Sequence, residues 1–137
     1  MNNQLMETSL SVAAMVEGAY AGLAAGDASA LAAALTDDVA LHVPGTHPLA
    51  GEHRGVDGVL AFVAGTSAAA DGGERIELVD VLAGRDHVAA LCRITATRPG
   101  RPPLDNRTVH LLGLRDGRIA EIWLHNFDDL SVNEFWS

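Results

Sequence analysis

Residues 107–129 read RTVHLLGLRDGRIAEIWLHNFDD, with apolar and polar side chains alternating on both sides of Asp116 and Gly117. An Asp-Gly pair between two alternating stretches is a strong short-range signal of a β-hairpin with a two-residue turn. In such a turn Arg115 pairs with Arg118. The stretch therefore predicts two long antiparallel strands, each of which carries one histidine.

The hairpin register decides whether the two histidines meet. Counted from the turn, His110 lies opposite Trp123 and His125 opposite Thr108, and side chains return to the same face at every second residue. One face then carries Thr108, His110, Leu112, Glu121, Trp123 and His125, while the other carries Val109, Leu111, Ile122 and Leu124. In this register the two imidazoles are diagonal neighbours, roughly 5–8 Å apart at Cβ on a flat sheet.

A histidine pair at this distance predicts general acid/base chemistry, because imidazole titrates near neutral pH. Glu121 or Asp128 would orient one of the rings. Two other placements stay open. The histidines can be exposed or interface residues, and the cleaner apolar face that carries Val109 and Ile122 would suit helix packing or a dimer.

The rest of the second half of the chain also predicts β-structure. Alternating stretches separated by the turn signals GRD, PGRPP and DG lie at residues 74–84, 86–98, 105–115 and 117–127. An earlier strand with Val39, Leu41 and Val43 on one face ends at Pro44-Gly45. We therefore expect a sheet of several long, mainly antiparallel strands.

The first half predicts helices. Apolar residues recur at three- and four-residue steps over 11–25, and Gly26 is placed to end this helix. Asp27 can cap a second short helix over 28–36, and a third helix is expected over 56–69. Helices followed by antiparallel strands indicate an α+β fold. We expect a single domain over 1–137, with a flexible tail at 1–8.

Composition narrows the possible partners. The 137-residue chain has a formal net charge of −9 and a pI near 4.9, which argues against nucleic acid or an anionic membrane as a partner. Hydrophobic residues make up 48% of the chain and aromatic residues only 4%, so small side chains must fill the core and a cavity is expected. The single cysteine, Cys92, is expected in that core.

The sequence also shows no signal for a membrane, a leader or a metal site. There is no secretory leader pattern and no run of about 18 apolar residues, so a soluble cytoplasmic protein is expected. His42, His47 and His53 follow no familiar ligand spacing, and we expect no metal and no cofactor.

Three stretches of the chain resemble the SnoaL-like, polyketide cyclase branch of the NTF2-like superfamily, over about residues 12–136. The most specific parts are AGD at 25–27, PG at 44–45, RDGRIAEIW at 115–123 and NEFW at 133–136. The resemblance implies a cone (a cystatin-like α+β roll) in which three N-terminal helices pack on a strongly curved, mainly antiparallel sheet. It also implies an apolar pocket and a homodimer through the outer face of the sheet.

The catalytic sets of the superfamily are not kept. By resemblance to ketosteroid isomerase, its base falls on Val43, which cannot take a proton, and its oxyanion aspartate falls near Val109 or His110. By resemblance to limonene-epoxide hydrolase, an Asp-Arg-Asp set falls on Thr95, Arg93 and His125, so only the arginine is present. The fold therefore does not fix the function.

We predict a pocket for a small, apolar, polyketide- or steroid-like molecule. His125 is the expected main acid/base, with His110 beside it. The expected substrate-binding residues are Tyr20, Arg93, Trp123, Leu41, Val43 and Phe62. The reaction would be a cofactor-free cyclisation, isomerisation, dehydration or hydrolysis. The alternative is a ligand-binding or dimeric assembly protein without turnover.

Overall fold

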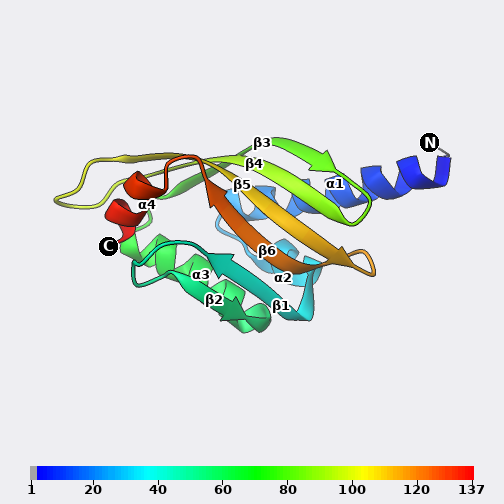
Figure 1. Cartoon of the computed structure of the whole chain (residues 1–137), viewed down its shortest axis with the longest axis horizontal. Helices are drawn as coiled ribbons and strands as arrows, with labels where there is room; N and C mark the ends of the chain where they lie inside the picture. Colours follow the sequence, from blue (N-terminus) through cyan, green and yellow to red (C-terminus); the bar gives the residue numbers. More distant parts are fainter. Residues whose placement is uncertain (1–2) are drawn as a thin grey trace.

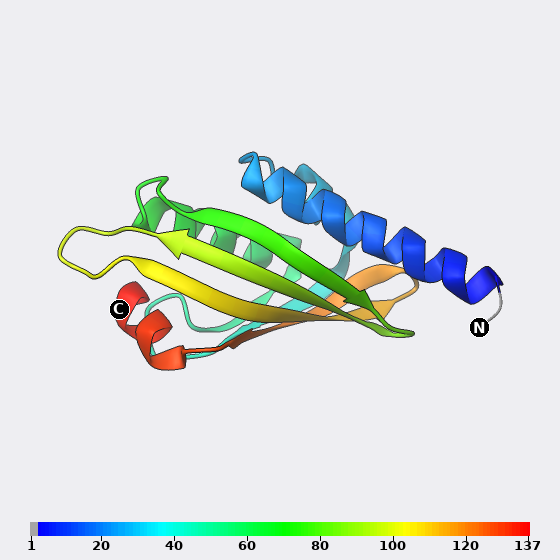
Figure 2. The ribbon, with the colours of Figure 1, turned by 90° about the horizontal axis from the view of Figure 1, so that it is seen from above.

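The computed structural model describes residues 3–137, with side chains from Met6 onward, as helices packed on one curved sheet (Figures 1 and 2). The helices are α1 (Asn3–Ala24), α2 (Ser29–Ala34), α3 (Gly55–Ala69) and α4 (Asp129–Trp136). The strands are β1 (Leu35–Val43), β2 (Gly51–Arg54), β3 (Arg75–Ala83), β4 (His87–Ala96), β5 (Leu104–Arg115) and β6 (Arg118–Asn126). The expected α+β class is confirmed.

The six strands form one sheet in the order β2-β1-β6-β5-β4-β3. All neighbouring strands are antiparallel except β1 and β6, which run parallel. Helices α1, α2 and α3 lie on the same, concave face of the twisted sheet, and α4 lies at the end where β6 finishes (Figures 1 and 2). This arrangement places the core between the helices and the concave face.

Three elements differ from the expectation. Helix α1 begins at Asn3, eight residues before the predicted start, and takes in residues 3–8 of the predicted tail, while residues 1–2 lie outside the described part. The stretch expected as a loop contains the short edge strand β2. A fourth helix follows β6, and Asp128 caps it by accepting a hydrogen bond from the Ser131 backbone N–H at 3.1 Å.

The joint between α1 and α2 forms as its sequence predicts. Gly26 adopts a left-handed φ of 79°, which glycine takes without strain. Asp27 Oδ1 then accepts a hydrogen bond from the Ser29 backbone N–H at 2.9 Å. The chain therefore reverses within a few residues, and both helices contact each other above the sheet.

Small and branched apolar residues build the core. Val16, Leu35, Val39, Val88 and Cys92 are fully buried, so the expected placement of Cys92 is confirmed. On α3, Val59 is buried and its neighbours Phe62 and Val63 pack against the same cluster. Few aromatic rings are available to fill the space between the helices and the sheet, and a cavity remains there.

The hairpin between β5 and β6 has the predicted turn but not the predicted register. Asp116 and Gly117 both have positive φ, and Arg115 pairs with Arg118. The register then shifts by one, because Ala120 on β6 has no partner between the Gly113–Glu121 and Leu114–Ile119 pairs. Such a bulge moves every later side chain of that strand to the opposite face of the sheet.

The shifted register separates the two histidines. His110 now pairs with Leu124, and His125 pairs with Val109. Residues Ile122 and Leu124 therefore share the concave face with His110, while His125 lies on the outer face. The predicted diagonal pair of imidazoles is wrong, because the two-residue turn fixes the register only as far as the bulge.

Candidate functional site

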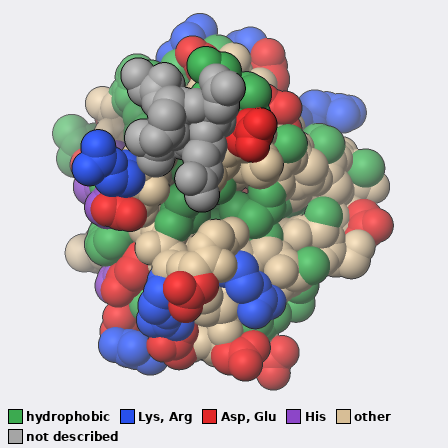
Figure 3. Space-filling view, turned by 90° about the vertical axis from the view of Figure 1, so that its right-hand side faces the viewer, with side chains coloured by type: hydrophobic (Ala, Val, Ile, Leu, Met, Phe, Trp, Pro, Cys, Tyr) green, Lys and Arg blue, Asp and Glu red, His purple; other side chains and the backbone are tan. Residues whose placement is uncertain are grey.

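An apolar cavity of about 120 Å³ lies between α1, α3 and the concave face of the sheet. Most of its lining is hydrocarbon, including Val16, Ala19, Leu31, Val59 and Leu112. Figure 3 looks at the side of the molecule where α1 begins. Hydrophobic side chains lie in the recessed centre of that side, with charged residues around it. In a cavity lined in this way, the few polar groups of the wall are the candidates for orienting a ligand.

Tyr20 and His110 lie in this wall, and Cys92 lies behind them, so that three side chains from three different elements meet. Tyr20 Oη of α1 lies 2.6 Å from His110 Nδ1 of β5, which is hydrogen-bonding distance. Cys92 Sγ of β4 lies 3.9 Å from the same nitrogen. Tyr20 is 8% exposed and Cys92 is fully buried. The three groups therefore form one polar cluster, which we call the Tyr20–His110–Cys92 cluster.

Burial holds all three groups in their neutral forms. It lowers the pKa of His110 to about 4 and raises the pKa of the Cys92 thiol to about 11. Burial, followed by the proximity of Cys92, also raises the pKa of Tyr20 well above its usual 10. At neutral pH the cluster therefore holds an uncharged imidazole, an uncharged phenol and a thiol.

A neutral imidazole bonded through Nδ1 leaves Nε2 free to act on a ligand. When Tyr20 donates to Nδ1, Nε2 carries the proton and can donate to a carbonyl oxygen. When Nδ1–H donates to the Tyr20 oxygen instead, Nε2 is a base. The cluster can thus polarise a carbonyl or accept a proton from a bound molecule.

Two further polar pairs lie in the cavity wall. The Thr66 hydroxyl of α3 donates to Glu74 Oε1 at 3.0 Å. Burial raises the pKa of the Glu74 carboxyl, and the bond from Thr66 partly offsets that rise. Asn106 Nδ2 of β5 donates to Asn126 Oδ1 of β6 at 3.0 Å.

The structure places five of the eight predicted site residues at this cavity. They are Tyr20, Leu41, Val43, Phe62 and His110. Leu41 and Val43 point inward on alternate positions of β1, and Phe62 comes from the inner face of α3. These five positions follow from the alternation and the helical spacing of their own elements.

The other three predicted residues, His125, Trp123 and Arg93, lie on the outer face of the sheet. The bulge at Ala120 turns His125 and Trp123 outward, and His125 is exposed. Arg93 is turned outward because the inward-facing positions of β4 are those of Ala90, Cys92 and Ile94. Their expected placement inside the pocket is therefore wrong.

Arg93 and Trp123 each contact another side chain on the outer face. Both Nε and Nη2 of Arg93 donate to the Asp105 carboxylate at 2.9 Å. The Trp123 ring stacks on His42, with 5.6 Å between centroids and 12° between planes. Neither side chain is therefore available to contact a ligand in the cavity.

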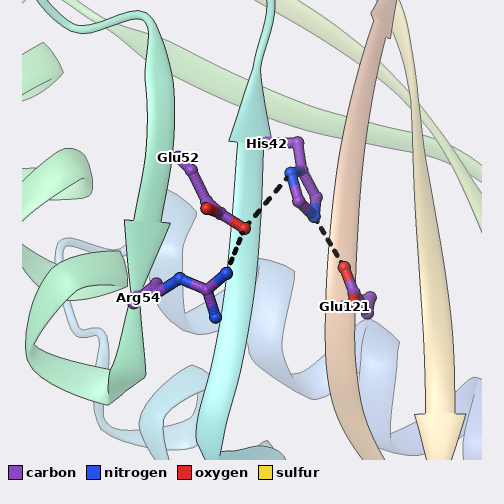
Figure 4. Close-up of polar contacts among 4 residues, drawn as sticks. All are labelled: His42, Glu52, Arg54 and Glu121. Carbon is purple, nitrogen blue, oxygen red and sulfur yellow. Dashed lines mark hydrogen bonds and ion pairs between the residues drawn. The ribbon is translucent and has the colours of Figure 1, made fainter.

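His42 also belongs to a polar cluster on the outer face (Figure 4). Its Nε2 lies 2.6 Å from Glu121 Oε2, and its Nδ1 lies 3.8 Å from Glu52 Oε1. Arg54 Nη2 lies 3.0 Å from the same Glu52 oxygen. Glu121 therefore bonds to His42 on the neighbouring strand, and it orients neither of the predicted catalytic histidines.

Sequence reasoning missed Asn106, Asn126, Thr66 and Glu74 as lining residues. A signal for the first was present, because the inner face of β5 reads Leu104, Asn106, Thr108, His110 and Leu112. Three consecutive polar residues on a strand face that covers a core are unusual, since a buried polar group costs free energy unless it is hydrogen-bonded.

The described part of the chain has neither a membrane-spanning helix nor a cluster of metal ligands. Within residues 3–137, no helix is both long enough and apolar enough to cross a membrane. No three metal-ligating side chains among the described His, Cys, Asp and Glu residues lie close enough together to hold an ion.

Comparison with known proteins agrees with this architecture. The SnoaL-like domain family matches residues 16–122. An uncharacterised protein of Mycobacterium tuberculosis (strain ATCC 25618 / H37Rv) is 39% identical over 124 residues, which cover 90% of this chain and 94% of the relative.

Two solved structures share the fold over nearly their whole length. Bal32a, from a soil-derived mobile gene cassette, gives a TM-score of 0.89 at 27% identity and covers 95% of this chain and 99% of its own. A protein of unknown function with a cystatin-like fold from Xanthomonas campestris gives 0.83 at 27% identity, with 92% and 98% covered. The chain therefore belongs to the SnoaL-like domain family.

Proposed function

We propose that this SnoaL-like protein binds a small, largely apolar molecule in the cavity and catalyses a cofactor-free proton transfer on it, with His110 as the acid/base. The observation that carries the proposal is the hydrogen bond between Tyr20 and His110 inside an otherwise apolar wall. Titratable groups with strongly shifted pKa values in a cavity are typical of functional sites.

The proposed chemistry starts from the neutral imidazole. His110 Nε2 takes a proton from a carbon next to a carbonyl group, and the electron pair of the broken C–H bond moves onto the carbonyl oxygen to form an enolate. The new imidazolium returns the proton to another carbon of the same molecule, which gives an isomer. The anion that forms beside it offsets the burial that otherwise disfavours imidazolium.

Tyr20 is the positioning residue in this scheme. Its hydroxyl fixes the plane of the imidazole through Nδ1 and can adjust to both protonation states, because a hydroxyl both donates and accepts. The enclosed apolar surroundings strengthen this bond relative to the same bond in water.

The cavity volume supports a small substrate. Ligand pockets for drug-sized molecules measure about 300–1,000 Å³, while an engineered cavity of about 150 Å³ holds benzene. The present cavity of about 120 Å³ favours a one-ring molecule over a steroid or a polycyclic polyketide.

Exchange of carbon-bound hydrogen in D₂O tests the proposal. We expect the wild type to accelerate α-proton exchange of 4-hydroxyacetophenone, measured by ¹H NMR, and His110→Gln to lower that acceleration by about 10²-fold or more. His125→Gln is the matched control, since this histidine lies on the outer face, and it should exchange like the wild type. Equal rates for the wild type and His110→Gln would reject His110 as the base.

A ligand-binding protein without turnover is the second candidate. The observation that favours it is Val43, which lines the cavity where the resemblance to ketosteroid isomerase places a base. Binding of 4-hydroxyacetophenone with no exchange above the buffer rate would support this candidate.

We further propose a homodimer through the outer face of the sheet. Leu91, Val109, Leu111 and Trp123 form an apolar area on β4, β5 and β6 that is only partly buried within one chain. Light scattering coupled to size-exclusion chromatography would give twice the monomer mass of 14.3 kDa if the proposal is correct.

A further inference from the structure

The Asn106–Asn126 pair contains a polar atom that the protein does not satisfy. Asn106 is 6% exposed and lines the cavity, and its Nδ2 donates to Asn126 Oδ1 at 3.0 Å. Its Oδ1 is buried and is the one buried side-chain nitrogen or oxygen in the described chain without a hydrogen-bond partner. This acceptor therefore faces no protein donor.

An unpaired buried acceptor is costly, and folded proteins rarely keep one. The surroundings of Asn106 would readily accept an apolar residue, because Leu104 and Leu112 occupy equivalent positions on the same face of β5. Val132 and Trp136 of α4 line the same cavity and are buried. Apart from its bond to Asn126, the amide thus lies in a mainly apolar part of the cavity wall and is not required there for packing.

The position of the pair relative to His110 sets the length of a ligand that reaches both. Asn106 and His110 share one face of β5 and are four residues apart, about 13 Å along the strand. A benzene ring with two para substituents spans a comparable distance when one hydrogen bond of about 3 Å is added at each end.

We infer that the cavity takes a one-ring molecule with a hydroxyl or N–H group that donates to Asn106 Oδ1 and a carbonyl group at the opposite end that faces His110. This inference rests on the proposed function, since it assigns the substrate class of the same cavity. Asn126 is a positioning residue, because its Oδ1 holds the Asn106 amide in the plane that presents the free oxygen.

Two probes that differ in one group test the inference by isothermal titration calorimetry. 4-Hydroxyacetophenone carries the donor, and 4-methylacetophenone has a methyl group in its place. We expect the wild type to bind the hydroxyl probe about tenfold more tightly, as one hydrogen bond to a buried acceptor allows. Asn106→Leu, of similar size, should remove this preference by weakening the hydroxyl probe alone.

The outcomes separate the inference from the proposed function. Equal affinity of the two probes for the wild type overturns the inference and leaves His110 catalysis standing, and this comparison needs no variant. A tenfold preference that disappears in Asn106→Leu supports the inference, even where proton exchange shows no dependence on His110. Binding of neither probe overturns both proposals.

Discussion

Histidine has different surroundings on the two faces of the sheet. On the concave face His110 is held neutral by burial and bonds to one uncharged partner, Tyr20. On the outer face His42 lies between two glutamates, and both it and Glu121 keep more than a third of their side-chain surface exposed. The histidine of the inner face is therefore neutral and bonded to an uncharged partner, whereas the partners of the histidine on the outer face are carboxyl groups.

One unpaired residue, Ala120, decides which β6 side chains belong to which face. It turns Ile122 and Leu124 toward the cavity and sends Trp123 and His125 outward. Gly113 accommodates the outward tryptophan, since a Cβ at this position would lie 3.3 Å from the Trp123 ring. The chemistry of the cavity thus depends on a local irregularity of the backbone more than on the composition of the strand.

Insertion of one alanine between Ile122 and Trp123 should have the largest effect. The bulge at Ala120 and the Leu112–Ile122 pair would stay, but every later residue of β6 would change face, so Leu124 would move outward and Trp123 and His125 would be forced into the core. Loss of a buried apolar side chain costs about 1.5–3 kcal/mol and a buried imidazole without a partner adds about 1–3 kcal/mol, so we expect the loss of more than about 3 kcal/mol in the free energy of unfolding, or insoluble protein. Urea denaturation followed by circular dichroism measures the change.

Insertion of one alanine after Pro102 is the control for this experiment. Pro102 is exposed in the loop between β4 and β5, where adding one residue shifts no strand face. We expect a near-normal unfolding midpoint for this variant. An insertion in β6 that unfolds like the loop variant would show that the strand absorbs the extra residue in a second bulge.

Most of the fold could be predicted from the sequence, since each signal was local. The Asp116-Gly117 turn, the Gly26-Asp27 joint and the alternation of β1 each depend on a few neighbouring residues. Helix α1 was underestimated because its first turns carry few apolar residues at helical spacing, and Leu10 remains 65% exposed there.

The site was less predictable, because its members come from separate elements. No local pattern links Tyr20 on α1 with Cys92 on β4 and His110 on β5, although the sequence predicts Tyr20 and His110 at the site and Cys92 in the core. The bulge was invisible for a related reason. Ala120 fits either face of a strand, so the alternation of residues around it gives no warning of the extra residue.

The free energy of unfolding should depend on pH, because His110 is neutral in the folded chain. Its pKa is about 4 in the folded chain and about 6.5 when unfolded, so between these values the unfolded chain binds the proton and the folded chain does not. The stability of the wild type relative to His110→Gln should therefore be constant above pH 6.5. It should fall as the pH drops to 4, by at most about 3 kcal/mol.

The difference between the two proteins isolates this one group. Glu74 has the opposite effect on the pH dependence of stability, because burial raises the pKa of its carboxyl in the folded chain, but it is common to both proteins. Urea midpoints at several pH values between 4 and 8 measure the difference. A difference that stays flat across this range would place His110 in contact with solvent and weaken the argument for a buried base.

The smallest effect is expected on the outer face, at the Arg93–Asp105 pair. Both side chains are substantially exposed, at 43% and 58%, so water and salt screen their attraction. We expect Asp105→Asn to lower the melting temperature by no more than about 3 °C, and by less in about 1 M NaCl. A larger loss that persists in high salt would mean that the pair is shielded from solvent. Because the Arg93–Asp105 pair is exposed within one chain, only a second copy could exclude solvent from it. This result would therefore support the proposed homodimer.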